Sequence, residues 1–341
     1  MQYKFLGNTG VLVSELCFGA MTFGGEGFWG NIGKQQQDEA NELVKTAHEN
    51  GINFYDTANV YSFGKSEQIL GQAFRDLGIS RNEIFLATKV RGRMSDKLND
   101  IGLSKYHILA SVDESLQRLG MDHIDLLYIH GVDAYTPLEE TMRALEDTVR
   151  SGKVRYLGVS NHAAWQIMKA NGFADRMGWN RFVATQLYYT IASRELEREL
   201  IPMIKDQRLA LMPWSPLAGG FLTGKYRRDH TSDGDRRRDA FDFPPIDKEK
   251  AYNIIDVMDE IAKEYEVSVA QVAIAWLLHQ PAVTSVIIGA KRKDQLLDNI
   301  ESVTLKMSRE ALARLDKVSA LNPEYPQWMI ERQGAGRVPE R

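Results

Sequence analysis

The chain has 341 residues, of which 43% are hydrophobic and 26% are charged, and its formal net charge is −4. These proportions exclude a largely disordered chain, and the absence of a basic excess argues against a general nucleic-acid binder. Cys17 is the only cysteine, which excludes an internal disulfide and favours a reducing, cytoplasmic compartment. We find no signal-peptide pattern and no apolar run long enough to span a bilayer.

Short apolar segments recur along the chain, starting after a predicted hairpin over residues 3–14. Asn8, Thr9 and Gly10 supply the turn chemistry of that hairpin. Eight strands are then expected at Leu16–Met21, Asn53–Thr57, Ile84–Val90, Asp125–His130, Arg155–Ser160, Ala184–Tyr189, Ala210–Trp214 and Ser285–Ile288. They are rich in Val, Ile, Leu, Phe and Tyr and do not alternate with polar residues. This composition is typical of parallel strands that are covered on both faces.

Amphipathic helices are expected between the strands. Their predicted ranges are Asp38–Asn50, Ser66–Leu77, Ser104–Leu119, Leu138–Arg150, Ala163–Ala170, Leu196–Gln207, Val269–His279 and Lys293–Ser302. Gly51, Gly78 and Gly120 follow three of them as C-terminal caps, and Pro137 starts another. Eight strands with a helix behind each predict an α/β fold, a (β/α)8 TIM barrel with the hairpin at its bottom. The competing doubly wound sheet would need a G-x-G-x-x-G turn after an early strand, and the chain has none there.

Three segments do not fit the repeat, but none of them marks a domain boundary, so residues 1–341 are expected to form a single domain. Residues 217–246, rich in Gly, Arg, Asp and Pro, are predicted to form a long loop over the cofactor. An extra amphipathic helix is expected over residues 247–266. The tail, residues 320–341, contains prolines and aromatic residues and is expected near the substrate pocket.

Polar residues stand at the C-terminal ends of several predicted strands, where the active site of this fold lies. They include Asp56, Lys89, His130, Gln186 and the pair Ser160–Asn161. Alone, each has an ordinary explanation: an acid can cap a helix, a lysine can extend to solvent, and a histidine can be a satisfied buried polar group. Their convergence on one end of the barrel favours an active site.

At these residues the sequence resembles the aldo-keto reductase family, in the branch of bacterial aldose or aldehyde reductases and potassium-channel β-subunits. The motifs that carry the resemblance are Gly-Ile-Asn-Phe-Tyr-Asp-Thr-Ala-Asn-Val-Tyr over 51–61, Ala-Thr-Lys over 87–89, Asp-Leu-Leu-Tyr-Ile-His over 125–130, Gly-Val-Ser-Asn over 158–161, the segment 214–225 and the segment 288–299. They follow in order at barrel spacing. One departure is Ser62, which stands where the family usually has glycine after the tyrosine.

The resemblance implies NADPH-dependent reduction of an aldehyde or ketone, with Asp56, Tyr61, Lys89 and His130 as the catalytic residues. Hydride passes from the nicotinamide to the carbonyl carbon, and Tyr61 acts as the general acid. Lys89, held by Asp56, is expected to lower the tyrosine pKa from its usual value of about 10. His130 is expected to orient the carbonyl through a hydrogen bond. No metal is expected.

The resemblance also implies the residues that hold NADP(H): Gly19, Met21, Asp56, Ser160, Asn161, Gln186, Trp214, Ser215, Pro216, Leu217, Gly219, Lys225, Arg236, Gly289, Lys291, Gln295, Asp298 and Asn299. In particular, Ser160, Asn161 and Gln186 would bind the carboxamide, and Trp214 would stack on the nicotinamide. Lys291, Arg292 and Lys293 begin a helix, where cations oppose the helix dipole. A bound 2′-phosphate would resolve that conflict, which favours NADPH over NADH.

Trp29, Tyr61 and His130 are the expected substrate contacts, and Phe28, Phe241 and Phe243 either line an aromatic pocket or pack the loops down. The expected partner is a small carbonyl or alcohol substrate, with no nucleic acid and no membrane. The alternative is a redox-sensing, nucleotide-binding regulatory subunit with little turnover. A phosphate-handling isomerase on the same barrel would leave the Asp, Tyr, Lys, His set without a purpose.

Overall fold

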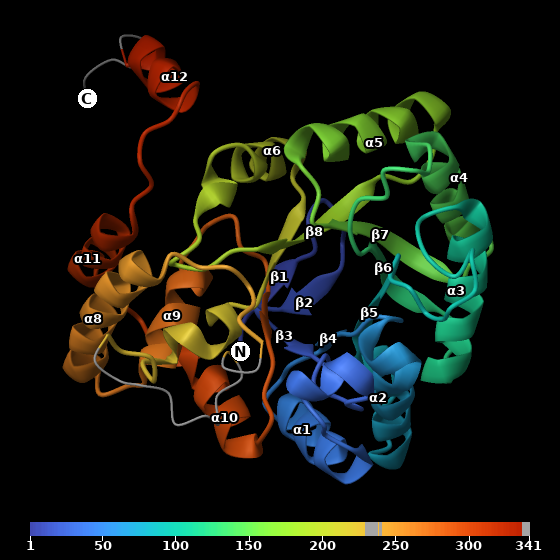
Figure 1. The fold of residues 1–341 in the computed structure, drawn as a ribbon, viewed down its shortest axis with the longest axis horizontal. Coiled ribbons are helices and arrows are strands. Elements are labelled where there is room, and N and C mark those ends of the chain that lie inside the picture. Colours follow the sequence, from blue (N-terminus) through green and yellow to red (C-terminus); the bar gives the residue numbers. More distant parts are fainter. Residues whose placement is uncertain (229–237, 239–240, 336–341) are drawn as a thin grey trace.

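Eight parallel strands form a nearly closed barrel in the computed structural model, which describes residues 1–228, 238 and 241–335 (Figure 1). The strands are β3 (Leu16–Gly19), β4 (Phe54–Asp56), β5 (Phe85–Val90), β6 (Ile124–Ile129), β7 (Val154–Ser160), β8 (Phe182–Tyr188), β9 (Ala210–Trp214) and β10 (Val286–Ile288). Their order is β10-β3-β4-β5-β6-β7-β8-β9. The backbone N–H groups of Thr284 and Ser285 donate to Leu211 O, which joins β9 to the start of β10. The predicted TIM barrel is confirmed.

Helices surround the strands as an outer ring (Figure 1). The described helices are α1 (Gln37–Glu49), α2 (Lys65–Asp76), α3 (Lys105–Leu119), α4 (Leu138–Arg150), α5 (Ala164–Met177), α6 (Leu200–Gln207), α8 (Lys248–Tyr265), α9 (Val269–Leu278), α10 (Lys293–Glu301), α11 (Arg309–Ser319) and, outside the ring, α12 (Gln327–Gly334). The extra helix expected over residues 247–266 is α8. Among the described residues, no helix is long and apolar enough to cross a membrane.

The strands bury two separate sets of side chains, as their apolar composition predicts. Residues that alternate along each strand point into the barrel and form an interior cluster. That cluster includes Cys17, Phe54, Phe85, Ala87, Leu126, Tyr128, Ala184, Ala210, Met212 and Ile287. The residues between them pack against the helices in a larger outer core. The same alternation continues to the C-terminal strand ends, which we call the mouth, and there the inward side chains become polar.

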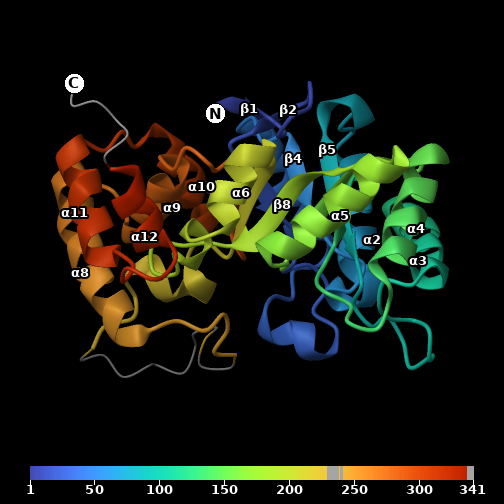
Figure 2. The same cartoon turned by 90° about the horizontal axis from the view of Figure 1, so that it is seen from above.

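The predicted hairpin is present as β1 (Tyr3–Phe5) and β2 (Leu12–Ser14), paired antiparallel. Leu6 and Val13 are fully buried and belong to the interior cluster, so the hairpin closes the bottom of the barrel. Turned by 90°, the structure has this hairpin at one end and the short helix η1 (Gly27–Asn31) at the other (Figure 2). The mouth therefore lies opposite the hairpin, beside η1.

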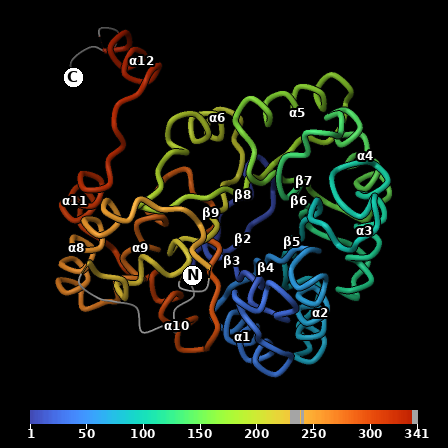
Figure 3. Tube along the Cα trace, in the orientation of Figure 1, coloured from blue at the N-terminus to red at the C-terminus, as the bar shows by residue number. Residues whose placement is uncertain are grey.

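The C-terminal part of the chain differs most from the sequence-based expectation, because two helices that the pattern did not predict lie there: α11 just before the tail and α12 within it. The chain leaves the barrel wall after α11 and ends in α12, which stands outside the ring of helices (Figure 3). None of the residues of α12 is buried. Glu324 accepts a hydrogen bond from Arg198, and Gln327 donates to Arg198 O. Because these contacts lie at the outer wall, a role of the tail in the substrate pocket stays a prediction.

Candidate active site

Asp56 and Lys89 form a buried ion pair at the mouth. Asp56 ends β4, Lys89 is the fifth residue of β5, and both side chains follow the inward alternation of their strands. Lys89 Nζ donates to Asp56 Oδ1 at 2.5 Å and to Thr57 O at 2.7 Å. Gln186 on β8 donates from Nε2 to Asp56 Oδ2 at 2.8 Å. Both carboxylate oxygens are therefore bonded, as a buried charge requires.

Tyr61 lies over this ion pair, in the short helix η2 (Tyr61–Gly64) that follows β4. Lys89 Nζ is 3.3 Å from Tyr61 Oη and 4.8 Å from the ring centroid. The Tyr61 ring meets His130 edge to face at 5.7 Å and meets Trp29 of η1 at 5.2 Å. The four predicted catalytic residues and Trp29 thus come together at one point of the mouth.

Burial and the ion pair shift the pKa of Lys89 in opposite directions. Burial alone would lower the lysine pKa, but Asp56 and Tyr61 outweigh it and raise the pKa above its usual value. The pKa of Asp56 is raised by burial, against the opposing effects of Lys89 and Gln186. We take the pair as an ammonium beside a carboxylate, because each charge is bonded directly to the other.

The ionisation of Tyr61 differs from the sequence-based expectation. Burial raises the pKa of Tyr61 above its usual value, and the effect of Lys89, which is to lower it, only partly compensates. The phenol is therefore protonated at neutral pH and can donate a proton. Burial, then the charges of Lys89 and Arg91, hold the pKa of His130 well below its usual value. His130 is accordingly neutral near pH 7, with one ring N–H to donate.

Two serines that the sequence analysis did not assign to the site hold the Tyr61 segment in place by hydrogen bonds. Ser66 Oγ donates to Ala20 O at 2.7 Å and lies 2.9 Å from Thr57 Oγ1. Ser62 Oγ donates to Phe23 O at 3.1 Å and accepts from the Gly25 N–H at 2.9 Å. Ser62 is buried and has a φ of 48°, a left-handed value that favours glycine. The residue that departs from the family pattern therefore ties the Tyr61 segment to the loop that carries Trp29.

The residues predicted to bind the carboxamide already make hydrogen bonds within the protein. Ser160 Oγ donates to Gln186 O at 2.8 Å. Asn161 Nδ2 donates to His130 O at 3.0 Å, and Trp214 Nε1 donates to Asn161 Oδ1 at 3.1 Å. Asn161 has a φ of 56° and is exposed at the mouth. It links His130 on one side of the mouth to Trp214 on the other.

Small residues and left-handed backbone surround the adjoining part of the mouth. Gly19 ends β3 and Gly289 directly follows the neighbouring strand β10. A Cβ on Gly289 would meet only Gly19 O, at 3.8 Å. After β9, the residues with positive φ are Ser215, Ala218, Gly219, Gly220 and Gly224. Within this turn the N–H groups of Ala218 and Gly219 donate to Ser215, and that of Gly220 donates to Leu217 O. Met21 is partly exposed, Pro216 is buried, Leu217 is partly buried and Lys225 is exposed.

The predicted adenine-end residues Gln295, Asp298 and Asn299 lie along α10. The Lys291 N–H donates to Gln295 Oε1 at 3.1 Å, and Asn299 Nδ2 donates to Gly289 O at 3.4 Å. Asp298 accepts from Ser268 and Gln271, at 2.9 and 2.8 Å, so its carboxylate is engaged with the start of α9. The cofactor roles of these residues stay predictions.

Arg236 lies outside the described residues, but Arg238 from the same arginine run is described and is buried. Its Nη1 donates to Ala218 O at 2.7 Å, and its Nε donates to Asp242 Oδ1 at 2.8 Å. Arg238 therefore anchors the long loop to the left-handed turn after β9. The predicted cofactor role of Arg236 stays a prediction.

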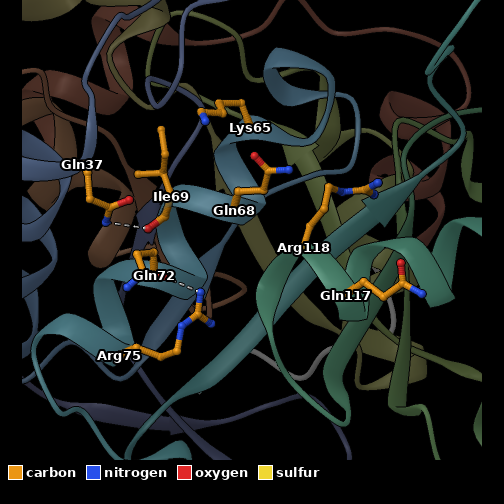
Figure 4. Close-up of a pocket in the computed structure, with 8 residues that line it drawn as sticks. All are labelled: Gln37, Lys65, Gln68, Ile69, Gln72, Arg75, Gln117 and Arg118. Atoms are coloured by element: carbon orange, nitrogen blue, oxygen red, sulfur yellow. Dashed lines mark hydrogen bonds between the residues drawn. The ribbon is translucent and has the colours of Figure 1, made fainter.

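A cleft of about 490 Å³ on the outer wall contains none of these residues (Figure 4). It is lined by Gln37, Lys65, Gln68, Ile69, Gln72, Arg75, Gln117 and Arg118. Its two arginines are already bonded, Arg75 to Leu119 O and Arg118 to the buried carboxylate of Glu67. The mouth, with its buried ion pair and its tyrosine, is thus the better candidate for chemistry.

Comparison with known proteins agrees with the geometry. The model of the aldo/keto reductase family matches residues 15–320, which confirms the resemblance drawn from the motifs. A versiconal hemiacetal acetate reductase of Aspergillus parasiticus is 37% identical over 93% of this chain and 96% of its own length. A putative aryl-alcohol dehydrogenase of Schizosaccharomyces pombe is 35% identical, over 92% and 95%. A probable voltage-gated potassium channel subunit beta of Arabidopsis thaliana is 36% identical, over 96% and 99%.

Proposed function

The chain belongs to the aldo/keto reductase family, and on that premise we propose that it is an oxidoreductase that uses NADPH to reduce aldehydes or ketones to alcohols. The observation that carries the proposal is the position of Tyr61 Oη, 3.3 Å from a buried ammonium that is itself bonded to Asp56. A buried phenol beside a fixed cation is suited to give up a proton at the moment when charge develops on the substrate oxygen.

The proposed roles follow from the surroundings of each residue. NADPH would supply the hydride. Tyr61 donates its proton to the carbonyl oxygen, and the ammonium of Lys89 stabilises the phenolate that remains. Asp56 keeps Lys89 charged and in place. His130 is neutral because of its low pKa, so it can hold the carbonyl oxygen by a hydrogen bond without competing as a proton donor.

A dinucleotide fits the residues of the mouth. Gly289 leaves open space, because a Cβ there would meet only Gly19 O at 3.8 Å, and Gly19 has no room for a side chain, because a Cβ there would come within 2.9 Å of Ile287 Cγ2. The left-handed turn after β9 has the kind of backbone that borders anion sites and would lie beside the pyrophosphate, and the partly exposed Trp214 would contact the nicotinamide. Ser160, Asn161 and Gln186 would hold the carboxamide, with Gln186 shared between the nicotinamide and Asp56. Arg238, which donates to Ala218 O, would hold this turn in place.

The preference for NADPH over NADH rests on the start of α10. Lys291, Arg292 and Lys293 are exposed there. Arg292 already pairs with Asp294 and Lys293 lies 3.9 Å from Glu42, and a 2′-phosphate would add an anion beside this cationic group at the helix N-terminus, where the helix dipole favours negative charge. Gln295, Asp298 and Asn299 would then contact the adenine end. Trp29, beside Tyr61, would hold the body of the substrate. A cytoplasmic location and a small-molecule partner complete the proposal. The alternative of a redox-sensing subunit is supported by relatives that are named as potassium channel subunits beta.

One experiment separates the enzyme from the sensor. The protein is mixed with NADPH and a panel of aldehydes and ketones, and the nicotinamide absorbance is followed. We expect turnover with carbonyl substrates, abolished in Tyr61→Phe while NADPH binding, measured by fluorescence, is nearly unchanged. Tight NADPH binding without oxidation by any carbonyl would refute the enzyme and favour the sensor. Loss of NADPH binding in Tyr61→Phe would refute the role of Tyr61.

A further inference from the structure

Arg91 extends the set of polar residues at the mouth beyond the four proposed catalytic side chains. The strand register pairs Lys89 with Tyr128 and Val90 with Ile129, so Arg91 and His130 are the next residues on the two strands. The His130 N–H donates to Val90 O at 3.0 Å, which keeps the strand ends together at this point. Arg91 therefore stands at the mouth, one residue beyond the end of β5.

The guanidinium of Arg91 is fixed in place. Its Nε and Nη2 both donate to Val132 O, at 3.2 and 3.1 Å, and Val132 is only two residues beyond His130. The Arg91 carbonyl accepts from the Gly102 N–H at 2.9 Å. Arg91 has a φ of 145°, a value that costs free energy for a residue with a side chain and that persists only where contacts enforce it. Such strain is concentrated at functional sites.

The charge of Arg91 is not balanced by a protein carboxylate. Lys89 has Asp56, but in the described part of the chain no acidic side chain lies within ion-pair distance of Arg91. The carboxylate of Asp133, in the same loop as Val132, accepts hydrogen bonds from the backbone N–H of Leu103 and from the hydroxyl of Thr136. Arg91 is partly exposed. Its charge also contributes, after burial, to the low pKa of His130 and of His162, so its field reaches the mouth.

We propose that Arg91 binds a carboxylate on the substrate, so that the protein prefers aldehydes or ketones that carry an acidic group over their neutral counterparts. The proposal rests on the reduction proposed above. The planar fork of a guanidinium matches a carboxylate through two parallel hydrogen bonds. With the carbonyl between Tyr61 and His130, the carboxylate would lie toward the end of β5, and Trp29 would cover the apolar part between them.

The test compares acids with neutral controls of the same shape. We would measure kcat/KM with NADPH for 3- and 4-carboxybenzaldehyde and for their methyl esters, with wild-type protein, Arg91→Gln and Arg91→Lys. Gln retains a donor for Val132 O but has no charge, and Lys retains the charge without the fork. The wild type should prefer at least one acid to its ester by tenfold or more. Arg91→Gln should lose that preference while its values for the esters change less than threefold, and Arg91→Lys should keep part of it.

Three results would overturn the assignment. Equal losses for acids and esters in Arg91→Gln would mean that Arg91 only holds the loop at Val132. The absence of a preference for acids in the wild type would mean that no carboxylate is bound there. Reduction of neither acids nor esters by the wild type would refute the proposed reductase activity, and the assignment of Arg91 with it. In the expected case, raising the ionic strength raises KM for the preferred acid and leaves KM for its ester unchanged.

Discussion

Ser62 offers the sharpest mutational test of how the site is held together. Ser62→Ala removes two hydrogen bonds, to Phe23 O and from the Gly25 N–H. Each bond contributes about 0.5–1.5 kcal/mol, so the free energy of unfolding should fall by about 1–3 kcal/mol. Ser62→Gly loses the same bonds but relieves the left-handed φ of 48°, which costs a non-glycine residue roughly 1 kcal/mol. The glycine variant should therefore be the more stable of the two.

Activity should change in a way that simple destabilisation does not explain. Without the hydroxyl, the loop that carries Trp29 is no longer tied to the Tyr61 segment and has to be ordered when substrate binds. A cost of about 1 kcal/mol raises KM about fivefold, whereas kcat should change little because Lys89 still contacts Tyr61. Urea unfolding and steady-state kinetics with NADPH measure the two effects. Unchanged stability and KM in Ser62→Ala, or a glycine variant less stable than the alanine variant, would refute this reasoning.

Two further predictions concern the ion pair and its pH dependence. Lys89→Met leaves Asp56 as a buried charge with only Gln186 bonded to it, and it should lower the free energy of unfolding, measured in urea, by about 3–5 kcal/mol. The double variant Asp56→Asn/Lys89→Met should lose less than the sum of the two single losses. Additive losses would contradict a coupled pair. Because burial raises the pKa of Tyr61, the phenol stays protonated below its usual pKa of about 10. The rate of carbonyl reduction should thus be flat from about pH 7 to 9, and alcohol oxidation, which needs the phenolate, should rise with pH. A decline in the reduction rate with an apparent pKa of 7–8 would mean that Lys89 dominates over burial after all.

The barrel and the convergence of the catalytic residues were predictable because both follow from local patterns. Strand alternation with a period of two, continued to the strand ends, decides which side chains point into the mouth. Asp56, Lys89, His130 and Gln186 all obey it. The hairpin was predictable from its turn residues, and α8 from its amphipathic spacing. Predicting these features requires no knowledge of which hydrogen bonds form between side chains far apart in the sequence.

The pairings within the site could not be predicted, because they depend on rotamers and on contacts between distant segments. The bond from Gln186 to Asp56 joins residues that are 130 positions apart, and the engagement of Asp298 with α9 depends on how α9 and α10 pack. The net pKa shift of Tyr61 depends on burial, which a single sequence does not quantify. The helix α12 has no buried face, so its sequence carried little of the apolar period that reveals a helix.

The most direct test of the central claim follows the hydride itself. NADPH deuterated at both C4 positions of the nicotinamide is incubated with the protein and an aldehyde, and the product is analysed by mass spectrometry. The account predicts an alcohol with one deuterium on the former carbonyl carbon, formed by the wild type and not by Tyr61→Phe. An alcohol without deuterium on that carbon, or equal formation by Tyr61→Phe, would contradict it.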